Sequence, residues 1–233
     1  MKNRFVLILL LFFLILSSTA YAENLLIKSK NITLDKNKEI SIFEKEVFIK
    51  TEENNTIISD YAEYNKKKGL LKLKKNIKAV DIQNNIIESD YAEYNEKEKI
   101  FISKGQTKII TTEKYVIESE NVIFNNNSNF IRSDSKTTII DQDQNIIILD
   151  NFEYQTKDNI FKSIGFIKVQ DKMGNSSEFS QIYIDTKKKE ILGTDIKAYM
   201  NQPNFKSVSK NKPRIFSNTV KISEQKKYFG NLF

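Results

Sequence analysis

The sequence contains no cysteine, no histidine and no tryptophan. Without cysteine, the chain can form neither a disulfide nor a thiolate metal site. Without histidine, it lacks the most frequent general base and the usual partner of a catalytic nucleophile. These absences exclude most familiar enzyme designs, so we expect a protein that is not an enzyme and that holds no cofactor and no metal ion.

Long apolar runs are also missing, with one exception near the N-terminus. Lys2 and Arg4 precede an apolar run from Phe5 to Leu16, and residues 17–22 are Ser-Ser-Thr-Ala-Tyr-Ala. This order is typical of a secretory signal peptide, so we predict that residues 1–22 are removed after Ala22. An uncleaved N-terminal anchor is the alternative. No later run is long enough to cross a bilayer as a helix, and the exported chain is expected to be soluble or peripheral.

Positive charge is in excess but is not concentrated. The formal net charge is +7, and the lysines are interspersed with Glu and Asp along the chain. A nucleic-acid surface needs a clustered basic patch. Together with the predicted export, this distribution predicts no nucleic-acid partner.

A repeat of about 30 residues runs through the chain after the signal. The sequence Ser-Asp-Tyr-Ala-Glu-Tyr-Asn occurs at residues 59–65 and again at residues 89–95. Weaker copies keep the same step at residues 30–35, 119–125, 150–155 and 180–185. Regular self-similarity of this kind indicates a repeat architecture.

Within each repeat, apolar and polar residues alternate, which predicts half-buried β-strands. One apolar column has odd numbers, whereas Ala62 and Tyr64 have even numbers. The alternation therefore slips near Ser59 and Asp60, which predicts a bulge or bend there. The odd-numbered column that precedes the slip consists of Ile27, Ile57, Ile87, Ile117 and Ile147. Two further apolar columns are Leu71, Phe101, Ile131, Phe161 and Ile191, and Ile49, Ala79, Ile109, Ile139 and Val169.

Other positions of the repeat predict bends and turns. A second bend is expected near Lys75, Gly105, Ser135 and Gly165, so that each repeat holds two kinked strands. An asparagine column at Asn55, Asn85, Asn145 and Asn175 predicts turns, because asparagine tolerates positive φ. Both prolines lie after residue 201, where apolar pairs are few, and this predicts a loosely structured C-terminal tail over residues 201–233.

Two all-β architectures fit such a repeat. One is an open, twisted β-jellyroll, a spiral of antiparallel strands, and the other is a parallel β-helix. Periodicity alone does not distinguish them.

The repeated motif resembles the OstA-like domain of the lipopolysaccharide-transport family. The similar segments are residues 59–65 and 89–95, followed by Gly-x-x-Lys-Ile/Val strands at residues 105–109 and 165–169. The resemblance covers residues 25–200 and implies an OstA-like β-jellyroll over residues 23–200. It also implies a periplasmic protein, with outer-membrane association as a further expectation. Either a free-standing bridge protein of the LptA kind or the N-terminal jellyroll of a longer LptD-like chain fits the sequence.

The resemblance further implies a function. Such a jellyroll is a carrier that binds the acyl chains of lipopolysaccharide in an apolar groove and passes them across the periplasm. Other jellyroll proteins of the bridge are the expected partners, joined by edge-strand addition at residues 25–34 and 187–200, and a head-to-tail homo-oligomer is a related expectation. The candidate groove residues are the inward columns Ile32, Leu34, Ala62, Tyr64, Ala92, Tyr94, Val122, Phe124, Phe152, Tyr154, Ile182 and Ile184.

Three other interpretations compete with that of a lipid carrier. The inward columns can be plain core, and the repeats can form a structural stalk or adhesin scaffold. Recurrent carboxylates such as Asp60 with Glu63, and Asp90 with Glu93, suggest acid–base catalysis. Because they recur with every repeat, as structural positions do, we interpret them as structural.

Overall fold

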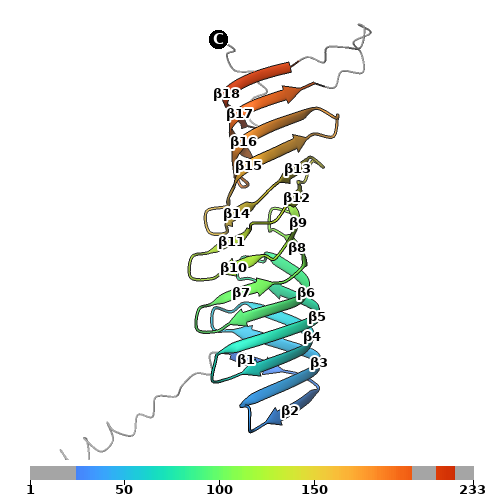
Figure 1. The fold of residues 1–233 in the computed structure, drawn as a ribbon, viewed down its shortest axis with the longest axis vertical. Helices are drawn as coiled ribbons and strands as arrows, with labels where there is room; N and C mark the ends of the chain where they lie inside the picture. Colours follow the sequence, from blue (N-terminus) through green and yellow to red (C-terminus); the bar gives the residue numbers. More distant parts are fainter. Residues whose placement is uncertain (1–24, 201–213, 224–233) are drawn as a thin grey trace, which may run out of the picture.

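The computed structural model describes residues 25–200 and 214–223, and all regular structure within them is β-strand. Eighteen strands pair with their neighbours in one continuous sheet that winds along the long axis of the molecule (Figure 1). Every pair is antiparallel, from β3 with β4 near one end to β17 with β18 at the other. The antiparallel spiral is therefore confirmed, and the parallel β-helix is excluded for this part of the chain.

The strands follow the repeat. Their bounds are β1 (Leu25–Lys28), β2 (Asn31–Asp35), β3 (Ile40–Thr51), β4 (Thr56–Asn65), β5 (Leu70–Val80), β6 (Ile86–Asn95), β7 (Ile100–Ser103), β8 (Gln106–Ile110), β9 (Val116–Glu120), β10 (Ile123–Asn125), β11 (Phe130–Ser133), β12 (Thr137–Ile140), β13 (Ile146–Leu149), β14 (Phe152–Gln155), β15 (Ile160–Gln170), β16 (Ser176–Asp185), β17 (Glu190–Tyr199) and β18 (Arg214–Ser223). None of the described residues forms a helix long and apolar enough to cross a membrane.

Each long strand bends near its middle, as the sequence predicts. The pairing of β4 with β5 shifts register between Ile58 and Tyr61, the position of the predicted slip. On the partner strand, Lys75 and Asn76 have φ angles of 66° and 49°. Extra residues of this kind leave the ladder locally unpaired and turn the strand. In the middle of the molecule the bend becomes a break, and Gly105 (φ 78°) separates β7 from β8.

The bends divide the spiral into two facing layers, which we call wall 1 and wall 2. Wall 1 consists of residues 31–44, 61–74, 91–104, 122–133, 152–164, 181–194 and 219–223. Wall 2 consists of residues 25–28, 47–59, 77–89, 106–120, 137–149, 167–179, 196–199 and 214–217. We call the side on which the chain passes from one wall to the other the hinge side.

The core lies between the two walls and is built from the predicted apolar columns. Ile57, Ile87 and Ile117 from wall 2 are 1–3% exposed, and Leu71 and Ile131 from wall 1 are 0–1% exposed. In β4 and β6 the inward positions change from odd to even numbers at the bend, whereas β5 keeps odd numbers inward on both sides of its bend, from Leu71 to Ala79. In each case both halves of the strand face the interior. Full burial of each large aliphatic side chain contributes about 1.5–3 kcal/mol, so these columns dominate the stability of the spiral.

The asparagine column has a different role from the predicted one. The positive φ angles in these turns belong to the preceding residues, such as Asn54 (64°) and Asn84 (67°). Asn85 instead donates from its side chain to Asp81 Oδ2 (2.8 Å), and Asn55 Oδ1 accepts from the backbone N–H of Ile82 (3.2 Å). The column therefore ties each turn together and links it to the turn of the next repeat.

The C-terminal region departs from expectation. Residues 214–223, within the predicted loose tail, form β18, which pairs with β17 along its length. Ile215 and Val220 face inward opposite Ala198 and Gly193, so β18 covers apolar surface that β17 would otherwise expose. The prediction that residues 187–200 carry the free C-terminal edge is therefore wrong. The predicted signal peptide, residues 1–22, and the rest of the tail lie outside the described residues.

The turn around Asp141 provides a test of this account. Asp141 accepts hydrogen bonds from the backbone N–H of Asp143 (2.8 Å) and Asn145 (2.9 Å), and from the Asn145 side chain (2.7 Å). Removing one acceptor from several donors costs about 1–3 kcal/mol, so Asp141→Ala should lower the free energy of unfolding by this amount in urea denaturation. Asp143→Ala, at an exposed position of the same turn, is the control and should have little effect. Equal stabilities of the two variants would contradict the assigned role.

Candidate functional site

The candidate site is the apolar space between the two walls. Of the residues predicted to line a groove, most are buried there: Ala62, Ala92, Tyr94, Val122, Phe124, Phe152, Tyr154, Ile182 and Ile184. Tyr64 is partly buried against the same core. Their sequence neighbours Tyr61, Glu63 and Glu93 lie on the outer face, where Lys74 covers the ring of Tyr61 at 5.2 Å.

Ile32 and Leu34 differ from the other predicted residues. They are 57% and 64% exposed, although Ile32 lies opposite Phe43, whose side chain faces inward. Both belong to β2, the last strand of wall 1 at the N-terminal end (Figure 1). They therefore form an exposed apolar rim at that end.

The opposite lining of the interior was not assigned to the site by sequence reasoning. Wall 2 contributes Ile49, Ile57, Ile109, Ile139 and Leu149, all 0–2% exposed. Two of the three odd-numbered columns, those of Ile57 and Ile109, carried the signal for this lining, and the third, that of Leu71, belongs to wall 1. Periodicity alone does not show that the columns of wall 2 face those of wall 1 across a single interior.

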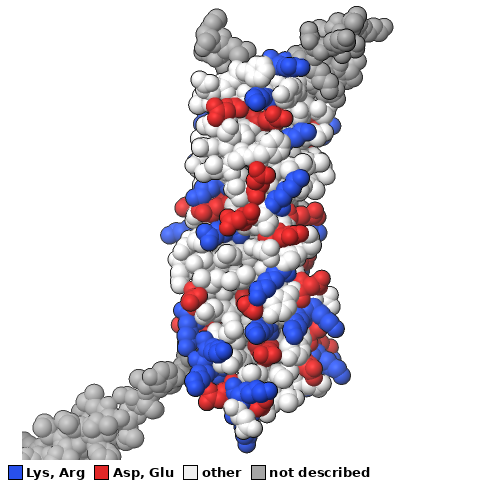
Figure 2. Space-filling view, viewed as in Figure 1, with Lys and Arg blue, Asp and Glu red and all other residues white. Residues whose placement is uncertain are grey.

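The interior is filled. Two cavities lie between the walls, of about 20 Å³ and about 10 Å³, and the larger has room for roughly one water molecule. Near the C-terminal end the walls touch so closely that a Cβ on Gly193 would lie 2.3 Å from Cδ1 of Phe179. The predicted open groove is therefore closed in this structure, and the space-filling view shows no trough on the face presented (Figure 2).

Hydroxyl groups line the hinge side of the interior. Ser103 Oγ lies 2.7 Å from Thr107 Oγ1, and Ser119 Oγ lies 2.8 Å from Thr137 Oγ1. Ser103 Oγ also accepts from the backbone N–H of Val122 (3.0 Å). These side chains satisfy polar groups that the bends remove from the ladder, which buried backbone requires. The hinge side thus joins the walls through both the chain and hydrogen bonds.

The opposite side, which we call the seam, lies between two rows of turns. Residues 66–69, 96–99, 126–129 and 156–159 belong to the row of wall 1, and residues 51–55, 81–85, 111–115 and 141–145 to the row of wall 2. Described hydrogen bonds across the seam come from side chains. Asn55 Nδ2 donates to Asn126 Oδ1 (2.9 Å), and the Tyr154 hydroxyl donates to Glu113 Oε2 (3.2 Å).

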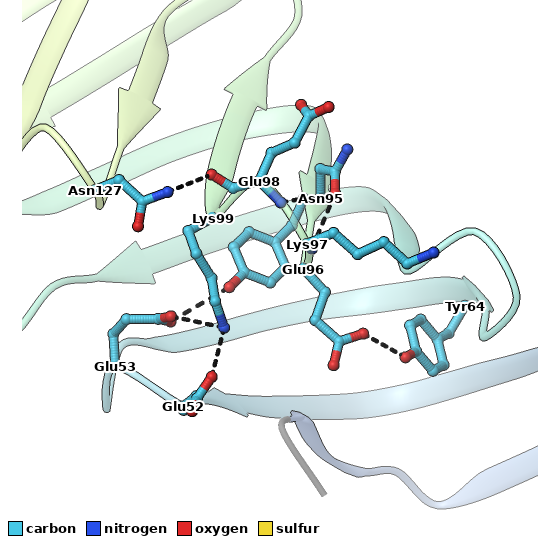
Figure 3. A network of polar contacts seen from close by, with 10 residues as sticks. Glu52, Glu53, Tyr64, Asn95, Glu96, Lys97, Glu98, Lys99 and Asn127 are labelled. Carbon is cyan, nitrogen blue, oxygen red and sulfur yellow. Dashed lines mark hydrogen bonds and ion pairs between the residues drawn. The ribbon is translucent and has the colours of Figure 1, made fainter.

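The densest contacts of the seam surround Lys99 (Figure 3). Lys99 Nζ lies 2.7 Å from Glu52 Oε2 and 2.8 Å from Glu53 Oε1, and the Tyr94 hydroxyl donates to Glu53 Oε2 at 3.3 Å. Lys99 and Tyr94 come from wall 1, and both carboxylates come from wall 2. The contacts therefore join one wall to the other.

These contacts perturb the titration of the groups involved. Partial burial raises the pKa of the Glu53 carboxyl, but the hydrogen bonds from Lys99 and its own backbone outweigh burial and leave the pKa lowered. Burial lowers the pKa of Lys99, and its bonds to Glu52 and Glu53 more than reverse this. Burial, with the charge of Glu53, raises the pKa of the Tyr94 hydroxyl. At neutral pH, Glu53 is therefore an anion, Lys99 a cation and Tyr94 a neutral donor.

The recurrent carboxylates do not converge on a reaction centre. Asp60 accepts from the Asn76 side chain at the bend (2.7 Å), and Asp150 accepts there from the backbone N–H of Phe166 (3.2 Å). Glu153 forms an outer-face ion pair with Lys162 (2.7 Å). In the described part of the chain, no cluster of acidic residues has the arrangement of a metal site.

Comparisons with known proteins show a likeness to solved structures. No family model and no curated protein matches the chain. Among solved structures, it is similar to the crystal structure of LptH, the LptA homologous periplasmic component of the conserved lipopolysaccharide transport device from Pseudomonas aeruginosa. The alignment covers 83% of this chain and 93% of that chain, with 10% identity and a TM-score of 0.21. Because the identity and the TM-score are low, we assign the architecture of the chain from its own strand pairing and not from this likeness.

A double-mutant cycle tests whether the seam contacts hold the walls together. Tyr94→Phe and Glu53→Ala, singly and together, should reveal a favourable coupling of about 1–3 kcal/mol, because the acceptor is charged. Chemical denaturation of the four proteins measures it. The same cycle for Glu153 and Lys162, a partly exposed pair on the outer face of one wall that does not join the two walls, should give less than about 1 kcal/mol. Strictly additive effects of the Tyr94 and Glu53 substitutions would refute a contribution of this contact.

Proposed function

We propose that the protein is a non-enzymatic lipid carrier of the bacterial envelope, which holds acyl chains of lipopolysaccharide between its two walls. One observation carries the proposal. Among the described residues, a continuous apolar interior runs the length of the spiral, and one of its two long sides is closed by side-chain contacts without strand pairing. The similarity of residues 59–65 and 89–95 to the OstA-like motif supports the same ligand, and the predicted signal peptide supports a periplasmic location.

The energetics favour an acyl chain as the occupant. Each buried CH₂ group contributes about 0.8 kcal/mol, so several chains would offset a substantial loss of contacts between the walls. When an acyl chain enters, apolar contacts between the two walls are replaced by apolar contacts between each wall and the chain. A phosphorylated headgroup is too costly to bury and would stay outside the walls. There, Lys66, Lys67, Lys68 and Lys97 are exposed on the turns of wall 1 and supply positive charge.

The filled interior favours a second candidate, a rigid scaffold. In that function, the columns of Tyr94 and Phe124 are simply core, and the walls never part. The scaffold and the carrier make opposite predictions for what an inward side chain meets in the cell.

The two ends of the spiral support a partner. β2 exposes Ile32 and Leu34 at the N-terminal end, and β18 has no strand beyond it among the described residues. Free edges pair with other edges unless charge, proline or bulges prevent it. We infer that related jellyrolls, or further copies of this chain, add to these edges head to tail.

Photo-crosslinking distinguishes the carrier from the scaffold. A photoreactive amino acid at position 64 or 124 faces inward, whereas one at position 63 or 93 faces outward, because neighbouring residues lie on opposite faces. In cells, lipopolysaccharide should be captured from the inward positions only. Each variant must first retain the β-sheet circular dichroism of the unmodified protein. Capture from neither face by folded protein would support the scaffold, and equal capture from both would indicate nonspecific adhesion.

Sedimentation tests the association of the ends. The average mass of the unmodified protein should rise with concentration, because head-to-tail contacts do not close. Ile32→Lys with Leu34→Lys places two charges on the N-terminal edge and should keep the protein monomeric. Ile82→Lys, at a turn position that is 67% exposed and lies away from both ends, is the matched control and should leave association unchanged. If the unmodified protein stayed monomeric at all concentrations, this result would contradict the predicted head-to-tail association.

A further inference from the structure

The two long sides of the interior differ in kind. On the hinge side, the chain itself passes between the walls at every repeat. On the seam side, the described hydrogen bonds and ion pairs between the walls involve side chains only: Tyr94 and Lys99 with Glu53, Lys99 with Glu52, Asn55 with Asn126, and Tyr154 with Glu113. Separating the walls at the seam therefore breaks no backbone ladder.

The tyrosine contacts recur at a fixed offset. Tyr94 and Tyr154 each bond a glutamate 41 residues earlier in the sequence, Glu53 and Glu113. The intervening position of the same column is Phe124, and 41 residues before it stands Gln83, so no hydroxyl is available there. Tyr94 and Tyr154 are 2% and 1% exposed, and a buried hydroxyl of this kind needs a partner. The two tyrosine contacts thus recur two repeats apart along the seam.

Two cavities of the interior lie beside these points. The larger cavity is lined by Tyr94 and Asn126 from wall 1 and by Asn55 from wall 2. The smaller cavity is lined by Tyr154 from wall 1 and Tyr115 from wall 2. Each lies at a seam contact and between the walls. Side chains around a void lose contacts on one side, so the walls adhere less strongly there than in the filled parts of the core.

We propose that the seam is the gate through which acyl chains enter the interior, and that the Tyr94–Glu53–Lys99 and Tyr154–Glu113 contacts are its latches. This inference rests on the proposed carrier function. Entry at the seam lets acyl chains pass sideways between the walls while the headgroup stays in water. Entry along the axis from an end would instead draw the polar headgroup past the apolar interior.

Reversible closure of the seam tests the gate. Because the natural sequence has no cysteine, Asn55→Cys with Asn126→Cys supplies the only two thiols, whose side chains replace a pair in contact across the seam at 2.9 Å. A short, reducible bis-thiol crosslinker then joins the walls. Binding of fluorescent lipopolysaccharide should fall at least tenfold after crosslinking and return on reduction. Glu63→Cys with Lys72→Cys, a neighbouring outer-face pair within wall 1, is crosslinked as the control and should bind normally.

Opening the latches tests the same gate from the other direction. Tyr94→Phe with Tyr154→Phe keeps both rings but removes both hydroxyls, and the rate of lipid uptake should rise roughly fivefold or more for the loss of two hydrogen bonds. A seam-crosslinked protein that binds lipid as fast as the reduced one would overturn the gate and leave the carrier function standing. Failure of the unmodified protein to bind lipid would overturn both.

Discussion

The bend near the middle of each strand is the constraint on which the rest of the structure depends. A straight strand with two-residue alternation places all its apolar residues on one face of one sheet. Here the register shift between Ile58 and Tyr61, and its equivalents in other repeats, turns the chain so that both halves of each strand face the interior, with a change of inward parity in β4 but not in β5. One sheet thereby supplies both walls of its own core. The hydroxyls of Ser103 and Thr137 lower the energetic cost of the bend, because they form hydrogen bonds with backbone polar groups near it.

Two unequal sides follow from this construction. The chain crosses between the walls at every bend, so the hinge side is continuous by covalent connection. The turns of each wall, in contrast, are joined to turns of the same wall, as in the bond from Glu96 N to Gly69 O (2.8 Å). Across the seam, the turns meet through side chains such as Asn55 and Asn126. A molecule built in this way has an inherent line of separation parallel to its long axis.

The sequence predicted the features that repeat and missed those that depend on how distant turns meet. Alternation and the 30-residue step predicted the strands, the bends and the inward columns, because each is set by local backbone geometry. The Tyr94–Glu53 contact joins residues 41 apart, a distance fixed by the twist that sets one wall across from the other. The strand at residues 214–223 was missed because its apolar residues change parity at Asn218, which hides the alternation in a short segment.

The chemistry of the seam helps to separate a carrier from a scaffold. A scaffold gains most when both sides of its core are sealed by apolar packing, since burying ions and hydroxyls carries a desolvation cost that their attraction only partly recovers. At the seam, however, Lys99, Glu53 and Tyr94 are retained together in a partly buried site. When the walls part, these groups regain water, so opening there costs less than exposing an equal area of aliphatic surface. A polar seam over an apolar interior therefore favours a structure that opens reversibly and closes in the same register.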